Sequence, residues 1–217
     1  MTIRYGKLAW FLMAWLLFST SVSAEEGPDV MIRNLTEQVM DQLLLEEDLM
    51  KTDPAHTQQV ARMLVNEFVI PHMDMKLMSR WIIGKSWRKA TAEQRQQFMD
   101  EFAGMLIRTY AGALVEFRGK SVTFKPFHRN PKRKDAVVRA EFSGGNGGPP
   151  IPVLFQVRQD KQKEWKVFDI IIDGVSLVKN YRSSFAAEIR KVGLDGLIKR
   201  LSTHNNNDGN KIAEEQG

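Results

Sequence analysis

The sequence contains no cysteine among its 217 residues. This absence excludes disulfide bonds, thiol catalysis, thiolate metal sites and lipid attachment at an N-terminal cysteine. The fold must therefore be stabilised by its apolar core alone. Hydrophobic residues make up 43% of the sequence, and a chain of this length can bury a core that suits a single domain.

Signatures of catalysis and of metal binding are also missing. The histidines, at His56, His72, His128 and His204, are scattered and do not have the spacing of zinc ligands. There is no G-x-S-x-G nucleophile elbow, and the glycine cluster at 144–148 lacks the Lys-Ser/Thr of a phosphate-binding loop. We therefore predict no enzyme activity, no metal site and no cofactor.

Three residues that could suggest chemistry have simpler explanations. Ser176 is expected to bond to the backbone at a strand-to-helix junction. Asp169 and Asp173 would share one face of a strand, but about 13 Å apart, which is farther than the paired carboxylates of glycosidases. Asp173 also precedes Gly174, a pair that is typical of turns.

The charge balance is only mildly basic, with a formal net charge of +5. No basic run is interleaved with stacking aromatics, so we do not expect nucleic acid as a partner. A local cluster surrounds a predicted hairpin tip: Arg129, Lys132, Arg133 and Lys134. Such a cluster is either ordinary solvated loop charge or a contact for acidic lipid head groups or an acidic partner surface.

The first 24 residues predict a secretory signal peptide. Arg4 and Lys7 give a positive start, Leu8–Phe18 is an uninterrupted apolar run, and Val22-Ser23-Ala24 has the small-x-small pattern of a cleavage site. The run is too short to cross a bilayer core, which takes about 20 residues. We expect cleavage after Ala24 and a mature chain that is free in its compartment.

Helical periodicity dominates the first half of the mature chain. Asp29 could cap a helix, and Asp53-Pro54 predicts the start of another that ends near Pro71. The apolar stripe of the first helix is Ile32, Leu35, Val39 and Leu43.

A long helix is predicted from the capping-box pattern of Thr91 and Gln94 to about Phe117. Its inward stripe is Phe98, Phe102, Leu106, Tyr110, Ala113 and Phe117.

From residue 120 the apolar period changes to two, which is typical of strands. The joints between the segments are short and rich in turn residues, so an antiparallel meander is favoured. Four strands are predicted, at 122–124, 136–142, 151–158 and 165–172.

After Asp173-Gly174 the pattern is helical again as far as Leu201, and the residues beyond are polar with an Asn205–Asn207 run. We therefore expect a signal peptide at 1–24, a single domain at 25–202 and a disordered tail at 203–217.

Two segments resemble a known protein family. The first includes PHMD at 71–74, GKSWRKAT at 84–91, EQRQQF at 93–98 and RTY at 108–110. The second includes WKVFD at 165–169, GVSL at 174–177 and NYRSSF at 180–185. Together they are similar to the MlaC family, also called toluene-tolerance proteins, and the match extends from about Val30 to Leu201.

The resemblance implies an α+β fold in which a four-stranded antiparallel sheet faces a helical layer, with a deep apolar pocket between them. It implies a periplasmic phospholipid carrier that helps to maintain outer-membrane lipid asymmetry in Gram-negative bacteria. The implied partners are an outer-membrane lipoprotein–porin complex and an inner-membrane ABC transporter with a hexameric lipid-binding ring. The family has no catalytic residues, and we expect a monomer.

A carrier needs more apolar wall than a packed core requires, with few groups that demand hydrogen bonds. Arg158 and Arg182 are candidates for contact with a phosphate head group or a partner near the pocket mouth. The candidate lipid-binding residues are Leu106, Tyr110, Leu114, Val153, Phe155, Val157, Phe168, Ile170, Ile172, Val175, Leu177, Tyr181 and Phe185.

Each of these apolar residues could instead be an ordinary core side chain. In that case the protein would be a periplasmic adaptor or chaperone that binds protein partners without lipid. An esterase or lipase is a third alternative, which the missing nucleophile elbow and histidine partner disfavour.

Overall fold

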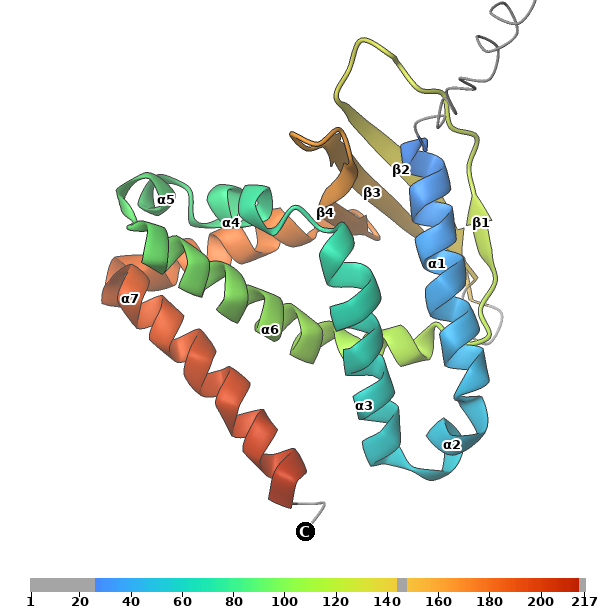
Figure 1. The fold of residues 1–217 in the computed structure, drawn as a ribbon, viewed down its shortest axis with the longest axis horizontal. Coiled ribbons are helices and arrows are strands. Elements are labelled where there is room, and N and C mark those ends of the chain that lie inside the picture. Colours follow the sequence, from blue (N-terminus) through green and yellow to red (C-terminus); the bar gives the residue numbers. More distant parts are fainter. Residues whose placement is uncertain (1–25, 144–147, 215–217) are drawn as a thin grey trace, which may run out of the picture.

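The computed structural model describes residues 26–143 and 148–214, with side chains as far as Asn206. The predicted signal peptide lies outside the described residues. The fold is α+β: helices pack against an antiparallel sheet, and the elements follow one another as labelled in Figure 1. The expected fold class is therefore confirmed.

The sheet is a meander with the strand order β1-β2-β3-β4-β5, and every neighbouring pair is antiparallel. The prediction of four strands was wrong by one, because Asp173 and Gly174 have positive φ angles of 48° and 79° and form a tight turn that folds the chain back on itself. The strands are β1 (Val122–Phe124), β2 (Asp135–Phe142), β3 (Ile151–Gln159), β4 (Trp165–Ile172) and the two-residue β5 (Val175–Ser176).

Strand β4 contains a bulge at Phe168. Asp169 pairs with Gln156 and Val167 pairs with Val157, which leaves Phe168 as an extra residue between the two pairs. An extra residue interrupts the strict alternation of side chains between the two faces of a strand. This bulge decides which apolar residues of β4 lie on each face of the sheet.

The first three helices form a hairpin beside the sheet (Figure 1). They are α1 (Pro28–Leu45), α2 (Glu47–Thr52) and α3 (Pro54–Leu64). The predicted Asp29 cap was wrong, since α1 begins at Pro28 with Gly27 at the cap position and no side-chain cap. The predicted start of α3 is confirmed: the Asp53 carboxylate accepts hydrogen bonds from the backbone N–H groups of Ala55 and His56, at 2.9 and 3.1 Å.

Helix α3 runs into a π-helical turn, η1 (Val65–Val69), and a 3₁₀ turn, η2 (Ile70–His72). The backbone N–H of Asp74 then donates to the carbonyl oxygen of Val167 at 2.8 Å, which ties this connection to β4. The next helices are α4 (Met75–Ile83), α5 (Lys85–Lys89) and α6 (Ala92–Glu116).

The predicted capping box of α6 is present in both directions. Thr91 Oγ1 accepts from the N–H of Gln94 at 3.0 Å, and Gln94 Oε1 accepts from the N–H of Thr91 at 2.9 Å. The helix ends within one residue of its predicted end. Phe98 and Phe102 are completely buried on its inner side.

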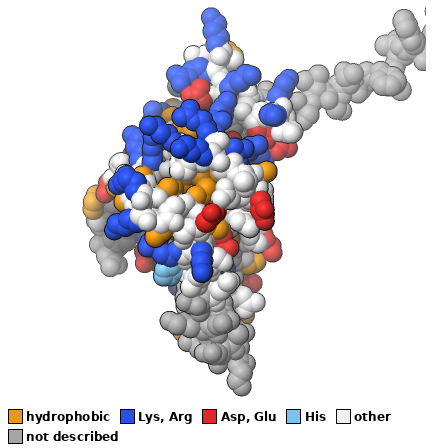
Figure 2. Space-filling model, turned by 90° about the vertical axis from the view of Figure 1, so that its left-hand side faces the viewer, with side chains coloured by type: hydrophobic (Ala, Val, Ile, Leu, Met, Phe, Trp, Pro, Cys, Tyr) orange, Lys and Arg blue, Asp and Glu red, His pale blue; other side chains and the backbone are white. Residues whose placement is uncertain are grey.

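The largest part of the core lies between α4, α6 and α7 (Leu177–Glu214). The Phe98 and Phe102 rings stack at 5.8 Å, and both meet Phe185 of α7 edge to face. These helices form the left-hand side of the molecule in Figure 1, and Lys and Arg side chains gather on its outer surface (Figure 2).

Helix α7 bends at Gly193, whose φ of 74° is accessible to glycine without steric cost. It then continues to Glu214, whereas the sequence predicts disorder from residue 203. The side chain of Asn205 donates to the carbonyl oxygen of Glu101 at 3.0 Å and bonds to Arg108, both on α6. These contacts with α6 keep the start of the segment from residue 203 helical. The polar composition of the segment gives no sign of such contacts.

The junction from β5 to α7 is fixed by a buried polar pair. Ser176 Oγ donates to the Asp169 carboxylate at 2.6 Å and accepts from the N–H of Lys179 at 3.1 Å. The other Asp169 oxygen accepts from the N–H of Val178 at 3.0 Å. The expected role of Ser176 at this junction is confirmed, and two otherwise unpaired N–H groups of the first turn of α7 are satisfied.

We expect Ser176→Ala to lower the free energy of unfolding by about 1–3 kcal/mol, because it removes the cap and leaves a buried carboxylate oxygen without its donor. Asp169→Ala should cost at least as much, and the double variant should cost less than the sum of the two. Urea denaturation measures all three values. Additive effects would show that the two side chains do not act as one cap.

Candidate functional site

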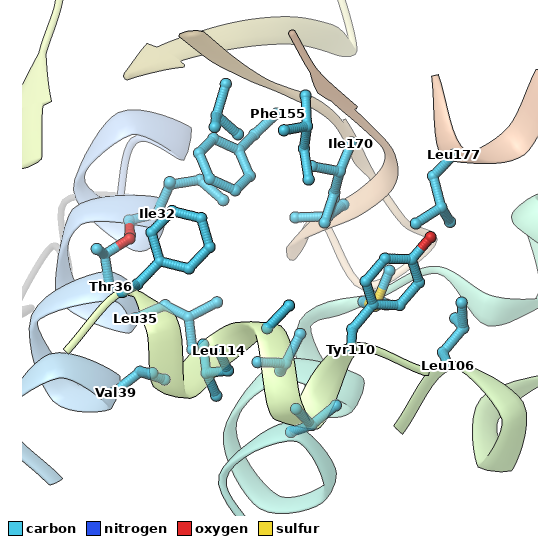
Figure 3. A pocket seen from close by; sticks show the side chains of 18 of the residues that line it. Ile32, Leu35, Thr36, Val39, Leu106, Tyr110, Leu114, Phe155, Ile170 and Leu177 are labelled. Atoms are coloured by element: carbon cyan, nitrogen blue, oxygen red, sulfur yellow. The ribbon is translucent and has the colours of Figure 1, made fainter. Parts of the chain in front are cut away.

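A cavity of about 230 Å³ lies between α1, η1, the C-terminal half of α6 and one face of the sheet. Figure 3 shows it from close by, with Phe155 and Ile170 entering from the sheet, Leu35 and Val39 from α1, and Leu114 from α6. Ile172, at the end of β4, is 37% exposed, so this wall reaches the surface of the molecule.

The lining is apolar throughout. It contains no charged side chain, and only two of its residues carry a hydroxyl group. The lining residues are Ile32, Leu35, Thr36, Val39, Met40, Val65, Val69, Ile70, Met73, Leu106, Tyr110, Ala113, Leu114, Phe117, Phe142, Val153, Phe155, Val167, Ile170, Ile172 and Leu177.

The two hydroxyl groups do not make the cavity polar. Thr36 Oγ1 donates to the carbonyl oxygen of Ile32 in its own helix, at 2.8 Å. The Tyr110 hydroxyl lies 3.5 Å from that of Tyr181, and burial, with a smaller contribution from the bond to Tyr110, raises the pKa of Tyr181 above its usual range. Tyr181 therefore adds no negative charge beside the cavity. Water would find almost no hydrogen-bond partner here, whereas hydrocarbon would fit without loss.

The apolar stripe of α6 serves two purposes along its length. In the N-terminal half, Phe98 and Phe102 pack into the core between α4 and α7. In the C-terminal half, Tyr110, Ala113 and Phe117 continue the same stripe but line the cavity. The periodicity of the sequence does not distinguish these two environments, because both require apolar residues on one side of the helix.

Eight of the candidate residues named from the sequence do line the cavity. They come from α6, from the strands β3 and β4 and from the start of α7, and the structure brings them together around one space (Figure 3). They are Leu106, Tyr110, Leu114, Val153, Phe155, Ile170, Ile172 and Leu177.

Phe168 and Val157 do not line the cavity. The bulge in β4 turns Phe168 away, and its ring packs edge to face on Trp81 of α4 with the centroids 5.1 Å apart. Val167 takes the place that strict alternation assigned to Phe168. Val157 is completely buried beyond the end of the cavity, where it packs with Met31 and Trp165.

The remaining candidates also lie elsewhere. Val175 is 62% exposed, because it lies in β5, the short edge strand that follows the Asp173–Gly174 turn. Tyr181 and Phe185 belong to the core between α6 and α7. Arg158 and Arg182 are exposed and do not contribute to the cavity, so the structure gives no support for either as a head-group contact at its mouth.

Sequence reasoning missed the wall formed by α1 and η1. The apolar stripe that includes Ile32, Leu35 and Val39 predicts the inner side of a helix. Its residue types do not distinguish the part that lines the cavity from the part that packs in the core. Val65 and Val69 line the cavity from the π-helical turn. A π-helical turn has no clear sequence signal and is often found at functional sites.

Two further features of the described residues bear on function. Within them, no group of three or more His, Cys, Asp or Glu side chains is placed to hold a metal ion. No helix in the described part of the chain is both long and apolar enough to cross a membrane.

Comparisons with known proteins agree on one family. The model of the family described as MlaC protein matches residues 33–203. The chain is 24% identical over 195 residues to the intermembrane phospholipid transport system binding protein MlaC of Haemophilus influenzae, covering 89% of each chain. It is 27% identical over 173 residues to the toluene tolerance protein ttg2D of Pseudomonas putida, covering 79% of this chain and 77% of that protein.

A solved structure is also similar. It is that of a phospholipid-binding protein from Ralstonia solanacearum in complex with a phospholipid. The TM-score is 0.73 with 32% sequence identity, and the match covers 87% of this chain and 99% of that one.

Because Phe168 lies in the core and Phe155 lines the cavity, substitutions of these two residues should affect stability and ligand binding separately. We expect Phe168→Ala to lower the free energy of unfolding by about 3–5 kcal/mol, since a large buried ring is lost. The folded variant should still bind a fluorescent fatty-acid analogue, whereas Phe155→Asp should not. Urea denaturation and fluorescence titration measure the two effects. Loss of the analogue from folded Phe168→Ala would contradict the bulged arrangement of β4.

Proposed function

Because the chain belongs to the MlaC family, we propose that it is a periplasmic phospholipid-binding transport protein that carries its cargo with acyl chains in the cavity between α1, α6 and the sheet. The observation that carries this proposal is the lining itself: a cavity with no charged residue and no hydroxyl free of a protein contact. The phospholipid complex of the Ralstonia solanacearum protein supports it.

The energetics explain why a carrier is needed. Two acyl chains of about 15 methylenes each, at ~0.8 kcal/mol per methylene, disfavour transfer to water by about 24 kcal/mol. That exceeds the practical limit of non-covalent affinity, which is about 18–21 kcal/mol. Transfer from a bilayer to an apolar cavity is close to neutral, because both environments are apolar. The protein therefore lowers a kinetic barrier, and the direction of transport must be set by its partners.

The cavity has to widen to take a whole lipid. A cavity of about 150 Å³ accommodates benzene, so 230 Å³ corresponds to part of one acyl chain. Helix α1 is the wall best placed to move. Among the described residues, no hydrogen bond or ion pair joins α1 to the sheet, and it is held there by apolar packing of Met31 and Ile32 and by Arg33 over the Phe124 ring.

The partners that we propose are those implied by the family: the outer-membrane lipoprotein–porin complex and the inner-membrane ABC transporter with its hexameric ring. We also propose that residues 25–202 form one lipid-binding domain and that phospholipid is cargo rather than a cofactor. Nothing in the comparisons favours the alternative of an adaptor or chaperone without lipid.

We propose no catalytic step. The Ser176 hydroxyl bonds to the Asp169 carboxylate and to a backbone N–H, which is a structural arrangement, and no histidine is among its partners. A nucleophilic serine requires an adjacent general base. Hydrolysis of simple esters above the uncatalysed rate would overturn this part of the proposal.

Two neighbouring isoleucines of β4 test the function directly. Ile170 lines the cavity, and Ile171 is an identical, half-buried side chain on the opposite face. We expect Ile170→Asp, like Phe155→Asp, to abolish copurified phospholipid, because a carboxylate would be buried against hydrocarbon. Ile171→Asp should retain it. Mass spectrometry of the extracted lipid gives the result, and stoichiometric lipid in folded Ile170→Asp would exclude this cavity as the site.

Export to the periplasm has its own test. The signal-peptide pattern ends at Ala24, so we expect the mature protein to begin at Glu25. N-terminal sequencing of protein recovered from the periplasmic fraction measures this. An intact N-terminus on protein in the membrane fraction would contradict cleavage and release.

A further inference from the structure

Two helical segments of the chain carry basic residues and no acidic ones. Residues 75–92 cover α4, α5 and the start of α6, and residues 177–187 cover the first part of α7. Both lack aspartate and glutamate completely. Their basic residues are Lys76, Arg80, Lys85, Arg88, Lys89, Lys179 and Arg182, and all of these are exposed.

The fold brings the two segments together. Leu77 and Met78 of α4 pack in the same buried cluster as Val178 of α7. On this side of the molecule Lys and Arg side chains surround hydrophobic ones, whereas acidic side chains are fewer (Figure 2). The seven exposed basic residues on these elements are named the α4–α7 basic surface.

In the described part of the chain, the basic residues of this surface have no ion-pair partner. Asp74, which precedes α4, is occupied as a helix cap by the N–H of Leu77 at 2.8 Å. Asp169, beneath the start of α7, is buried and bonded to Ser176. The surface therefore presents a positive potential to solvent.

An exposed tryptophan lies within this surface. Trp81 follows Arg80 directly and precedes Lys85 by four residues, and it is 40% exposed. One side of its ring is held by Phe168. By contrast, Trp87 and Trp165 are only 6% and 5% exposed. A partly exposed indole among basic residues suits the boundary between lipid head groups and water.

We propose that the α4–α7 basic surface docks on a phospholipid bilayer that contains anionic lipids, with Trp81 at the level of the head groups. Lysines make up four of the seven cations. Lysine is depleted in protein–protein interfaces, where fixed geometry is needed, but its flexible point charge is well suited to a diffuse layer of lipid phosphates. A bilayer is therefore favoured over an acidic protein. The inference goes beyond the carriage of lipid in the cavity and does not depend on it.

Flotation with vesicles tests the proposal. The full chain should bind vesicles of phosphatidylcholine with phosphatidylglycerol, and not vesicles of phosphatidylcholine alone. Each Lys or Arg near an anionic surface changes partitioning about fivefold. We expect the triple variant Lys76→Gln, Arg80→Gln, Lys179→Gln to bind about a hundredfold more weakly.

A matched control removes the same charge from exposed loop lysines. We expect this control, the triple variant Lys132→Gln, Lys134→Gln, Lys161→Gln, to weaken vesicle binding by less than about tenfold, compared with about a hundredfold for the first triple variant. Equal losses in the two triple variants would overturn the proposal, because binding would then follow net charge and not this surface. The proposal would also be overturned if the unaltered chain did not bind anionic vesicles. Binding to polyglutamate without binding to vesicles would indicate an acidic protein surface as the partner.

Tryptophan fluorescence reports the orientation. Lipids with brominated acyl chains should quench the emission of the unaltered chain, and Trp81→Phe, which keeps an aromatic ring against Phe168, should remove most of this quenching. Unchanged quenching in Trp81→Phe would contradict the orientation. Ile170→Asp separates this inference from the carrier function, since it should lose cargo lipid but still bind anionic vesicles.

Discussion

A cavity lined almost entirely by apolar groups has to be filled by hydrocarbon or remain poorly packed, and the architecture of this protein follows from that constraint. Water inside it would lose hydrogen bonds, because the lining offers only Thr36 and Tyr110, whose hydroxyls already contact protein groups. An empty space deprives the surrounding side chains of dispersion contacts. The side chains that line the cavity therefore make better contacts with acyl chains than with water or with an empty space.

Local features of the backbone create this space. The bulge at Phe168 directs one large ring into the core beside Trp81 and leaves the smaller Val167 on the cavity side. The Asp74–Val167 backbone bond anchors the chain after η1 to the same strand. At the same end of the sheet face, Val157, the strand partner of Val167, packs against Met31 and Trp165. Helices and sheet therefore close on each other at this end, and the cavity lies beyond it, toward the exposed Ile172.

Much of the fold could be predicted from the sequence, because capping residues and apolar periods report local structure. The Asp53 and Thr91 caps, the meander and the family itself are confirmed. The site was harder to predict, since a wall residue and a core residue are equally apolar. Strict alternation misplaced Phe168 because a bulge has no signal in the sequence, and the apolar side of α1 looked like ordinary core.

The position of the acyl chains is tested most directly by methyl NMR of the protein loaded with a phospholipid that carries a spin label near the end of an acyl chain. We expect strong broadening of the methyl signals of Val153, Ile170 and Leu177, which line the cavity, and little effect on Ile171 and Val178, which do not. Broadening of the second group without the first, or of neither, would contradict the claim that the acyl chains lie in this cavity.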